Sequence, residues 1–194
     1  MEQDFFLSIE KLVKQHIFWK TFPGLELYFS YQDKVILHQT FGSISKEKNA
    51  PKLRKNCIFD IASLTKSYIT SLAILILAEQ KLLQLKLPFS RYLTKYKKTN
   101  KGAITISELL MHISGLPAWS PLFEDGFDIE VARNKLLQMS IESIPGSKMV
   151  YSCLGYLLLG EIVKAVSSLS LSQFCHEQIF SKLKQGIVTF KPVT

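Results

Sequence analysis

The chain has 194 residues, 47% of them hydrophobic and 21% charged, a globular balance that excludes an intrinsically disordered protein. Its 24 Lys and Arg residues against 16 Asp and Glu residues give a net charge of +8. The densest basic stretch, residues 95–101, is typical of a solvated loop between two helices, so the charge predicts no nucleic acid partner.

The sequence shows no pattern of secretion or membrane insertion. Its N-terminus lacks the basic start and long apolar run of a signal peptide. The longest apolar stretch, residues 72–78, is far shorter than the roughly 20 residues that span a bilayer. Three cysteines without a C-x-x-C pair predict neither a disulfide framework nor a zinc site. We therefore expect a soluble, cytoplasmic protein without a cofactor or stable membrane insertion.

The first half of the chain predicts a helix, a hairpin and a second helix. Apolar residues recur at helical spacing over residues 5–20. Two strands, 25–29 and 35–41, follow and are joined by a turn at 32–34. From Ser63 to about residue 80 a further helix is predicted, and over 68–78 it is apolar nearly all round. Such a helix is expected to be covered on every side.

The second half predicts a run of helices, which makes the fold class α+β. Thr105 and Glu108 have the spacing of a capping box, and Gly115 suits the left-handed end of that short helix. Further helices are predicted over 129–139, 154–166 and 172–183, and a weak strand over 186–190. The two clear strands make a poor sheet alone, since three or more are usually needed, so the sequence looks incomplete.

The strongest chemical signal is Ser63-Leu64-Thr65-Lys66 at the start of the apolar helix. Positions i and i+3 share a helix face, so the Lys66 ammonium can reach the Ser63 hydroxyl. A serine attacks only when a neighbour takes its proton, and Lys66 can do this if burial or other cations lower its pKa. Alone this motif is weak, because an ordinary N-cap serine produces the same pattern.

Four segments in order resemble one family. They are similar to motifs of the β-lactamase-related serine hydrolases. The four segments are Phe22-Pro23-Gly24 with its hairpin, residues 59–66, residues 109–117 (Leu-Leu-Met-His-Ile-Ser-Gly-Leu-Pro) and residues 145–156. This family includes class C β-lactamases, penicillin-binding proteins, esterases and D-alanyl-D-alanine carboxypeptidases. The resemblance covers about residues 10–190. It implies a β-lactamase/transpeptidase-like fold in which the single domain, 1–194, holds the helical lobe and N-terminal strands of a truncated protein, with most of the antiparallel sheet absent.

The same resemblance assigns roles to individual residues. Tyr151 would lie near Ser63 and Lys66 and act as a phenolate or proton shuttle, with Lys66 as the cation that lowers its pKa. Cys153 occupies the substrate-binding position where the family usually has Asn, and it is a poor hydrogen-bonding substitute. We expect Cys153 to be a small buried hydrophobe rather than a nucleophile.

The histidines are not expected to form a metal site. His112 is expected to be structural and to fix the Gly115-Leu116-Pro117 turn. His16, His38 and His176 show no metal-ligand spacing.

The implied function is a serine hydrolase that acts on ester or amide bonds through an acyl-enzyme on Ser63. Its substrates would be small esters, β-lactams or peptidoglycan-type molecules. The family's Lys-Thr-Gly or His-x-Gly strand motif, which supplies a second oxyanion donor, is absent from the sequence, so we expect impaired activity. The alternative is a non-catalytic remnant, or a fragment that associates with another chain through an open sheet edge.

Overall fold

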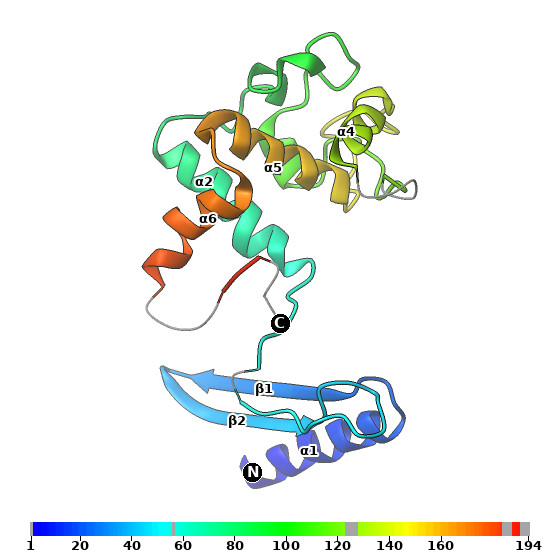
Figure 1. Ribbon diagram of the computed structural model, residues 1–194, viewed down its shortest axis with the longest axis vertical. Coiled ribbons are helices and arrows are strands. Elements are labelled where there is room, and N and C mark those ends of the chain that lie inside the picture. The colour runs from blue at the N-terminus through cyan, green and yellow to red at the C-terminus, as the bar shows by residue number, and fades with distance from the viewer. Residues whose placement is uncertain (1, 56, 123–127, 184–187, 191–194) are drawn as a thin grey trace. The chain divides into compact units, whose positions relative to one another are not determined.

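The structure, a computed structural model, describes residues 2–55, 57–122, 128–183 and 188–190. It divides into two compact units, Met1–Asp60 and Ile61–Thr194 (Figure 1). The first unit holds one helix and two strands, and the second is helical throughout the part that the structure describes. This order of elements confirms the predicted α+β class.

The first unit is a helix followed by a hairpin. Helix α1 (Glu2–Phe18) precedes strands β1 (Gly24–Tyr31) and β2 (Lys34–Gly42), which pair antiparallel and form a two-stranded sheet. Gln32 and Asp33 form the turn with φ of 47° and 61°. Two left-handed residues match the twist of the flanking strands, so the hairpin turns within two residues. The predicted hairpin is confirmed.

The second unit begins with the helix that follows Ser63. Its elements in chain order are η1 (Lys66–Ser71), α2 (Leu72–Glu79), η2 (Phe89–Arg91), η3 (Thr94–Tyr96), α3 (Ile106–Leu110), α4 (Ile129–Gln138), α5 (Cys153–Ser167), α6 (Leu171–Gln178) and η4 (Phe180–Lys182). The turn η1 is a π-helix that continues into α2. Each helix predicted in this half is confirmed to within a few residues.

Polar side chains set the starts of the helices. The predicted capping box is present, since Thr105 Oγ1 accepts from the Glu108 N–H and Glu108 accepts from the Thr105 N–H. The end of α3 differs from the prediction, because His112, with φ of 59°, takes the left-handed position just after the helix. Gly115, with φ of 77°, serves the following turn, where an added Cβ would lie 2.1 Å from the Ser143 carbonyl oxygen.

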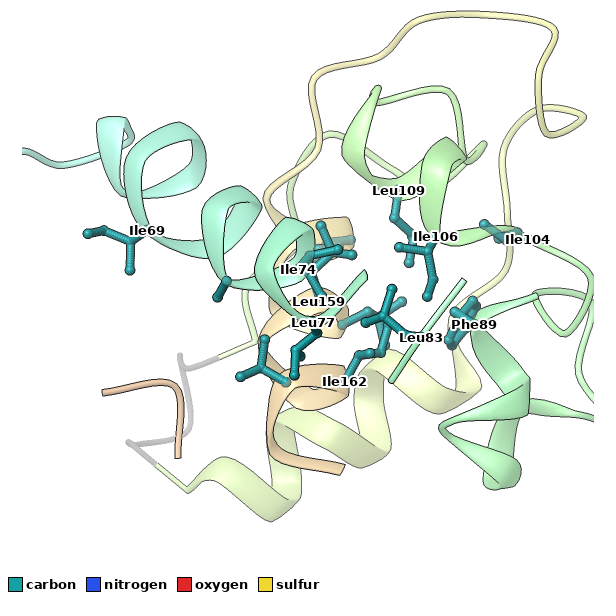
Figure 2. Close-up of a cluster of buried hydrophobic side chains, with 14 of the residues drawn as sticks. Ile69, Ile74, Leu77, Leu83, Phe89, Ile104, Ile106, Leu109, Leu159 and Ile162 are labelled. Atoms are coloured by element: carbon teal, nitrogen blue, oxygen red, sulfur yellow. The ribbon is translucent and has the colours of Figure 1, made fainter. Parts of the chain in front are cut away.

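The core of the second unit forms around α5. This helix contacts α2, α3 and α6 (Figure 1). Figure 2 shows Ile74 and Leu77 of α2 beside Leu159 and Ile162 of α5, all fully buried. Apolar side chains of both helices thus form one continuous cluster, which holds α2 against α5.

The predicted complete cover of the apolar helix is wrong. Ala73, Ile74 and Leu77 are buried, but Leu72 and Leu75 are 38% and 48% exposed. One face of α2 is therefore open to solvent.

The predicted weak strand over 186–190 lies partly outside the described residues, and 188–190 do not form a strand.

Within the described part of the chain, no single helix is long and apolar enough to cross a membrane. By length and composition alone, Cys153–Ser167 and Leu171–Lys182 pass that test together, with a bend of 69° between them.

Candidate active site

Ser63 lies on a tight turn immediately before the helix that carries Lys66. The Leu64 N–H donates to the Ile61 carbonyl and the Lys66 N–H to the Ser63 carbonyl, at 2.9 and 3.0 Å. Between them Ala62 has a φ of 44°, in the left-handed region. That conformation costs an alanine about 1–2 kcal/mol. Such strain is concentrated at functional sites, and here it adjoins the predicted nucleophile.

The structure brings all four sequence-predicted site residues together. Lys66 Nζ donates to Ser63 Oγ at 3.2 Å and lies 5.1 Å from the centre of the Tyr151 ring. Ser63 and Lys66 both lie close enough to Tyr151 to lower its pKa, and Lys66 and Cys153 line the same cavity. A hydroxyl, a phenol, a thiol and an ammonium group therefore meet where the start of η1 faces the start of α5.

The charges of Lys66 and Tyr151 are coupled. Burial lowers the pKa of Lys66, but its hydrogen bond to Tyr151 and its attraction to Cys153 outweigh this effect and raise the pKa above 10.5. Hydrogen bonds from Ser63 and Lys66 lower the pKa of Tyr151 below 10.0. Lys66 is thus an ammonium at neutral pH, and Tyr151 is the group shifted toward its basic form. The lowered lysine pKa that would make Lys66 the base is not found.

His112 packs against the ring of Tyr151 and holds the segment that carries it. Its Nδ1 accepts from the Ser152 N–H at 3.0 Å, and its carbonyl accepts from the Val150 N–H at 2.8 Å. Its ring centre lies 4.6 Å from that of Tyr151. Burial, and then the charge of Lys66, lower the pKa of His112, which keeps the ring neutral and Nδ1 free to accept. The structural role expected for His112 extends to positioning the Tyr151 segment.

The turn after α3 is tied to the same segment. Ser152 Oγ donates to the Pro117 carbonyl at 2.6 Å, and the Cys153 N–H donates to the Ala118 carbonyl at 3.0 Å. The Gly146 N–H donates to the Ile113 carbonyl at 2.7 Å. Residues 112–118 therefore hold the segment that carries Tyr151 and Cys153. Two motifs that are far apart in the sequence thus form one part of the site.

Cys153 and Tyr156 differ from the sequence-based expectations. Cys153 is half-buried and contacts Lys66, so it does more than fill space. Tyr156 carried no predicted role, yet its hydroxyl shares a hydrogen bond of 3.0 Å with Ser71 Oγ and donates to the Leu110 carbonyl at 3.1 Å. Its ring centre lies 5.9 Å from Lys66 Nζ. The only sequence signal for Tyr156 is its position one helical turn beyond Cys153, which places it toward the lysine.

Two curated relatives match most of the chain. A protein of Escherichia coli O157:H7, named as a predicted D-alanyl-D-alanine carboxypeptidase, is 26% identical over an alignment of 192 positions that covers 89% of this chain and 44% of that protein. An N-acetylmuramyl-L-alanine amidase of Bacillus subtilis strain 168 is 27% identical over an alignment of 191 positions that covers 89% of this chain and 43% of the relative. The chain thus spans less than half the length of these relatives.

The fold and the family follow from two further comparisons. A class C β-lactamase solved in complex with cefoxitin superimposes with a TM-score of 0.80 at 20% identity, over 93% of this chain and 49% of that one. This likeness confirms the predicted β-lactamase-like fold. The family model described as Beta-lactamase matches residues 9–192. The chain therefore belongs to the Beta-lactamase family.

Proposed function

We propose that this chain carries the nucleophile and the proton-transfer residues of a serine hydrolase that cleaves ester or amide bonds through an acyl-enzyme on Ser63. The observation that carries the proposal is the cluster in which Lys66 Nζ donates to Ser63 Oγ at 3.2 Å and lies 5.1 Å from the centre of the Tyr151 ring. A serine needs a base at this distance to become a nucleophile.

The shifts in pKa favour Tyr151 as that base. Tyr151, as phenolate, takes the Ser63 proton while Ser63 Oγ forms a bond to the substrate carbonyl carbon, and the Lys66 ammonium stabilises the phenolate. The Ser63 N–H, at the start of the helix, donates to the oxyanion. When the bond to the leaving group breaks, the Tyr151 hydroxyl returns the proton to that group. Water then attacks the acyl-enzyme while Tyr151 accepts its proton, and Tyr151 passes that proton to Ser63 Oγ as the acid is released.

The side chain of Cys153 favours esters over amides as substrates. It occupies the position where an Asn side chain would bind a substrate amide, and a thiol is a weak hydrogen-bond donor and acceptor. Esters need less help from such a group because the alkoxide is a better leaving group than an amine. We therefore propose small esters as the preferred substrates, ahead of β-lactams and peptidoglycan-type peptides.

Labelling with a fluorescent fluorophosphonate tests the proposal. The probe should label the 194-residue chain at one site, and Ser63→Ala should abolish the label. Lys66→Ala and Tyr151→Phe should each slow labelling by about 10² to 10⁴, because each removes part of the proton transfer. Tyr68→Phe is the matched control, since Tyr68 is 65% exposed. Labelling that persists in Ser63→Ala would refute the nucleophile assignment.

The pH dependence of labelling separates the two candidate bases. The lowered pKa of Tyr151 predicts that labelling rises with pH at values below 10.0, as the phenolate forms. The raised pKa of Lys66 predicts that the ammonium persists beyond pH 10.5. If Lys66 were the base instead, the rise would follow deprotonation of Lys66, and Tyr151→Phe would leave it unchanged.

A second candidate function, association with another chain, is favoured by one observation. Leu64, Tyr68, Leu72 and Leu75 lie on one face of the helix that follows Ser63, and their exposed fractions run from 38% to 65%. A stripe of this kind usually packs against an apolar partner. Sedimentation velocity should show concentration-dependent association that Leu75→Lys weakens. A monomer at all concentrations would exclude this candidate.

A further inference from the structure

A cavity opens directly beside the candidate active site. It has a volume of about 560 Å³ and lies within the second unit, where Lys66 and Thr70 face α5 and the start of α6. This volume falls within the range of about 300–1,000 Å³ typical of small-ligand pockets. Lys66 and Cys153 are among the residues that line it, and Lys66 Nζ is 3.2 Å from Ser63 Oγ. A group bonded to Ser63 can therefore extend into this space.

Much of the lining of the cavity is apolar. Its apolar side chains are those of Trp119, Leu122, Leu154, Leu157 and Leu171. Gly160 contributes bare backbone, and a Cβ added there would lie 3.8 Å from Leu171 Cδ2, at ordinary contact distance. A wall of this composition gains free energy when it loses contact with water, so it favours an aliphatic group over a polar one.

Arg133, which lines the cavity, does not offer a free anion site. Its guanidinium donates to both carboxylate oxygens of Glu161, at 2.8 and 2.7 Å. It also pairs with Glu130. Because the guanidinium is already neutralised, a chain ending in a carboxylate gains little from Arg133.

The position of Tyr151 decides which part of the substrate enters. Tyr151 returns the proton to the leaving alkoxide, so the alkoxide must lie beside it. Tyr151 is half exposed and does not line the cavity, whereas Lys66 and Cys153 do. The alcohol part of the ester therefore leaves past Tyr151 toward solvent, and the acyl part remains on the side of the cavity.

We infer that this cavity binds the acyl chain of the substrate, and that the chain is an unbranched aliphatic acyl group of medium length rather than acetyl. The inference rests on the proposed function, because the acyl chain is placed relative to Ser63. It assigns substrate-binding roles to Leu157, Gly160 and Leu171, none of which takes part in proton transfer.

Two alkyl fluorophosphonates that differ only in carbon chain, ethyl and octyl, test the inference on the full chain. Burial of two methylene groups is enough for about a tenfold effect, so the octyl probe should phosphonylate Ser63 at least tenfold faster than the ethyl probe. Gly160→Leu, which fills the cavity from within α5, should reduce this ratio to below threefold. Ala165→Leu adds the same side chain to an exposed position of α5 outside the cavity and should leave the ratio at its wild-type value.

If Gly160→Leu does not fold, Leu157→Trp is a second variant that tests the same inference. Leu157 is 39% exposed, so Leu157→Trp is tolerated on the surface while it narrows the cavity, and it should also lower the octyl-to-ethyl ratio. Equal rates for the two probes, with Ser63 labelled by both, would overturn the inference and leave the proposed function standing. Absence of Ser63 labelling by either probe would remove the proposed function and the inference with it.

Discussion

Helices α2 and α5 are both strongly apolar, yet the structure covers them differently. In α5 the residues Leu154, Leu158, Leu159, Ile162 and Val163 are at most 1% exposed. In α2 and the turn before it, Tyr68, Leu72 and Leu75 are 65%, 38% and 48% exposed, although the sequence over 68–78 contains almost no polar residue. The helix with less polar sequence is therefore the one with more exposed apolar surface.

This difference shows that the hydropathy of a helix indicates how much apolar surface it could bury. How much apolar surface it does bury depends on which other elements pack against it. Helix α5 contacts α2, α3 and α6, and the apolar residues named above are buried, although Leu157 is 39% exposed. Helix α2 contacts α5 and α6 and leaves both Leu72 and Leu75 exposed. Its open stripe begins at Leu64, beside Ser63. The candidate nucleophile thus lies where the well-packed core ends and uncovered apolar surface begins.

A lysine placed on each helix should produce the largest difference. Leu158→Lys puts an unpaired charge into the core, where the lost packing and the buried charge each cost several kcal/mol, out of a total of about 5–15 kcal/mol. We expect this variant to lose cooperative thermal unfolding. Leu75→Lys places the same charge on the open face and should change the midpoint by no more than a few degrees. If both variants unfold alike, α2 is as covered as α5, and the comparison is wrong.

The sequence predicted the helices, the hairpin and the site because each depends on local patterns. Thr105 and Glu108 are three residues apart, and a capping box needs no more than this spacing. Ser63, Lys66 and Tyr151 came from short motifs, two of them on one helix turn, and the resemblance linked them. The predicted α+β class with a short sheet follows from the same patterns, since two strands and a run of helices are visible directly.

The properties that the sequence did not predict depend on distances between separate segments. The raised pKa of Lys66 comes from Tyr151 and Cys153, about 85 residues away along the chain, and sequence alone favoured the opposite direction through burial. The left-handed conformation of Ala62 has no glycine to signal it. The position of His112 against Tyr151 likewise required both turns to be placed.

The pKa of Tyr96 should give an effect of intermediate size, because it depends on how well the core around α5 excludes water. Tyr96 is 1% exposed, and burial, aided by Glu161 of α5, raises its pKa from 10.0 to about 12. Because the folded-state pKa is raised, the stabilisation is fully present below pH 10 and is lost as the pH rises through about 12. The ultraviolet absorbance difference between wild type and Tyr96→Phe should show a phenolate forming only near pH 12. Formation near pH 10 would show that the cover of α5 is open.

The smallest expected effect concerns the polar contact that joins the two helices on their covered sides. Ser71, at the end of η1, shares a hydrogen bond of 3.0 Å with the hydroxyl of Tyr156 on α5, and the pair is partly buried. A bond of this kind contributes about 0.5–1.5 kcal/mol net. Tyr156→Phe should cost slightly more than Ser71→Ala, because it also removes the 3.1 Å bond to the Leu110 carbonyl.

A double-mutant cycle isolates the contact between α2 and α5 from these other losses. Urea unfolding of wild type, Ser71→Ala, Tyr156→Phe and the double variant should give a coupling energy of about 0.5–1 kcal/mol, since residues that share a hydrogen bond are not additive. Tyr68→Phe, on the open face, is the matched control and should leave the free energy of unfolding unchanged. Strictly additive losses would mean that apolar packing alone holds α2 against α5. In that case the loss in Tyr156→Phe would come from its bond to the Leu110 carbonyl and not from its contact with Ser71.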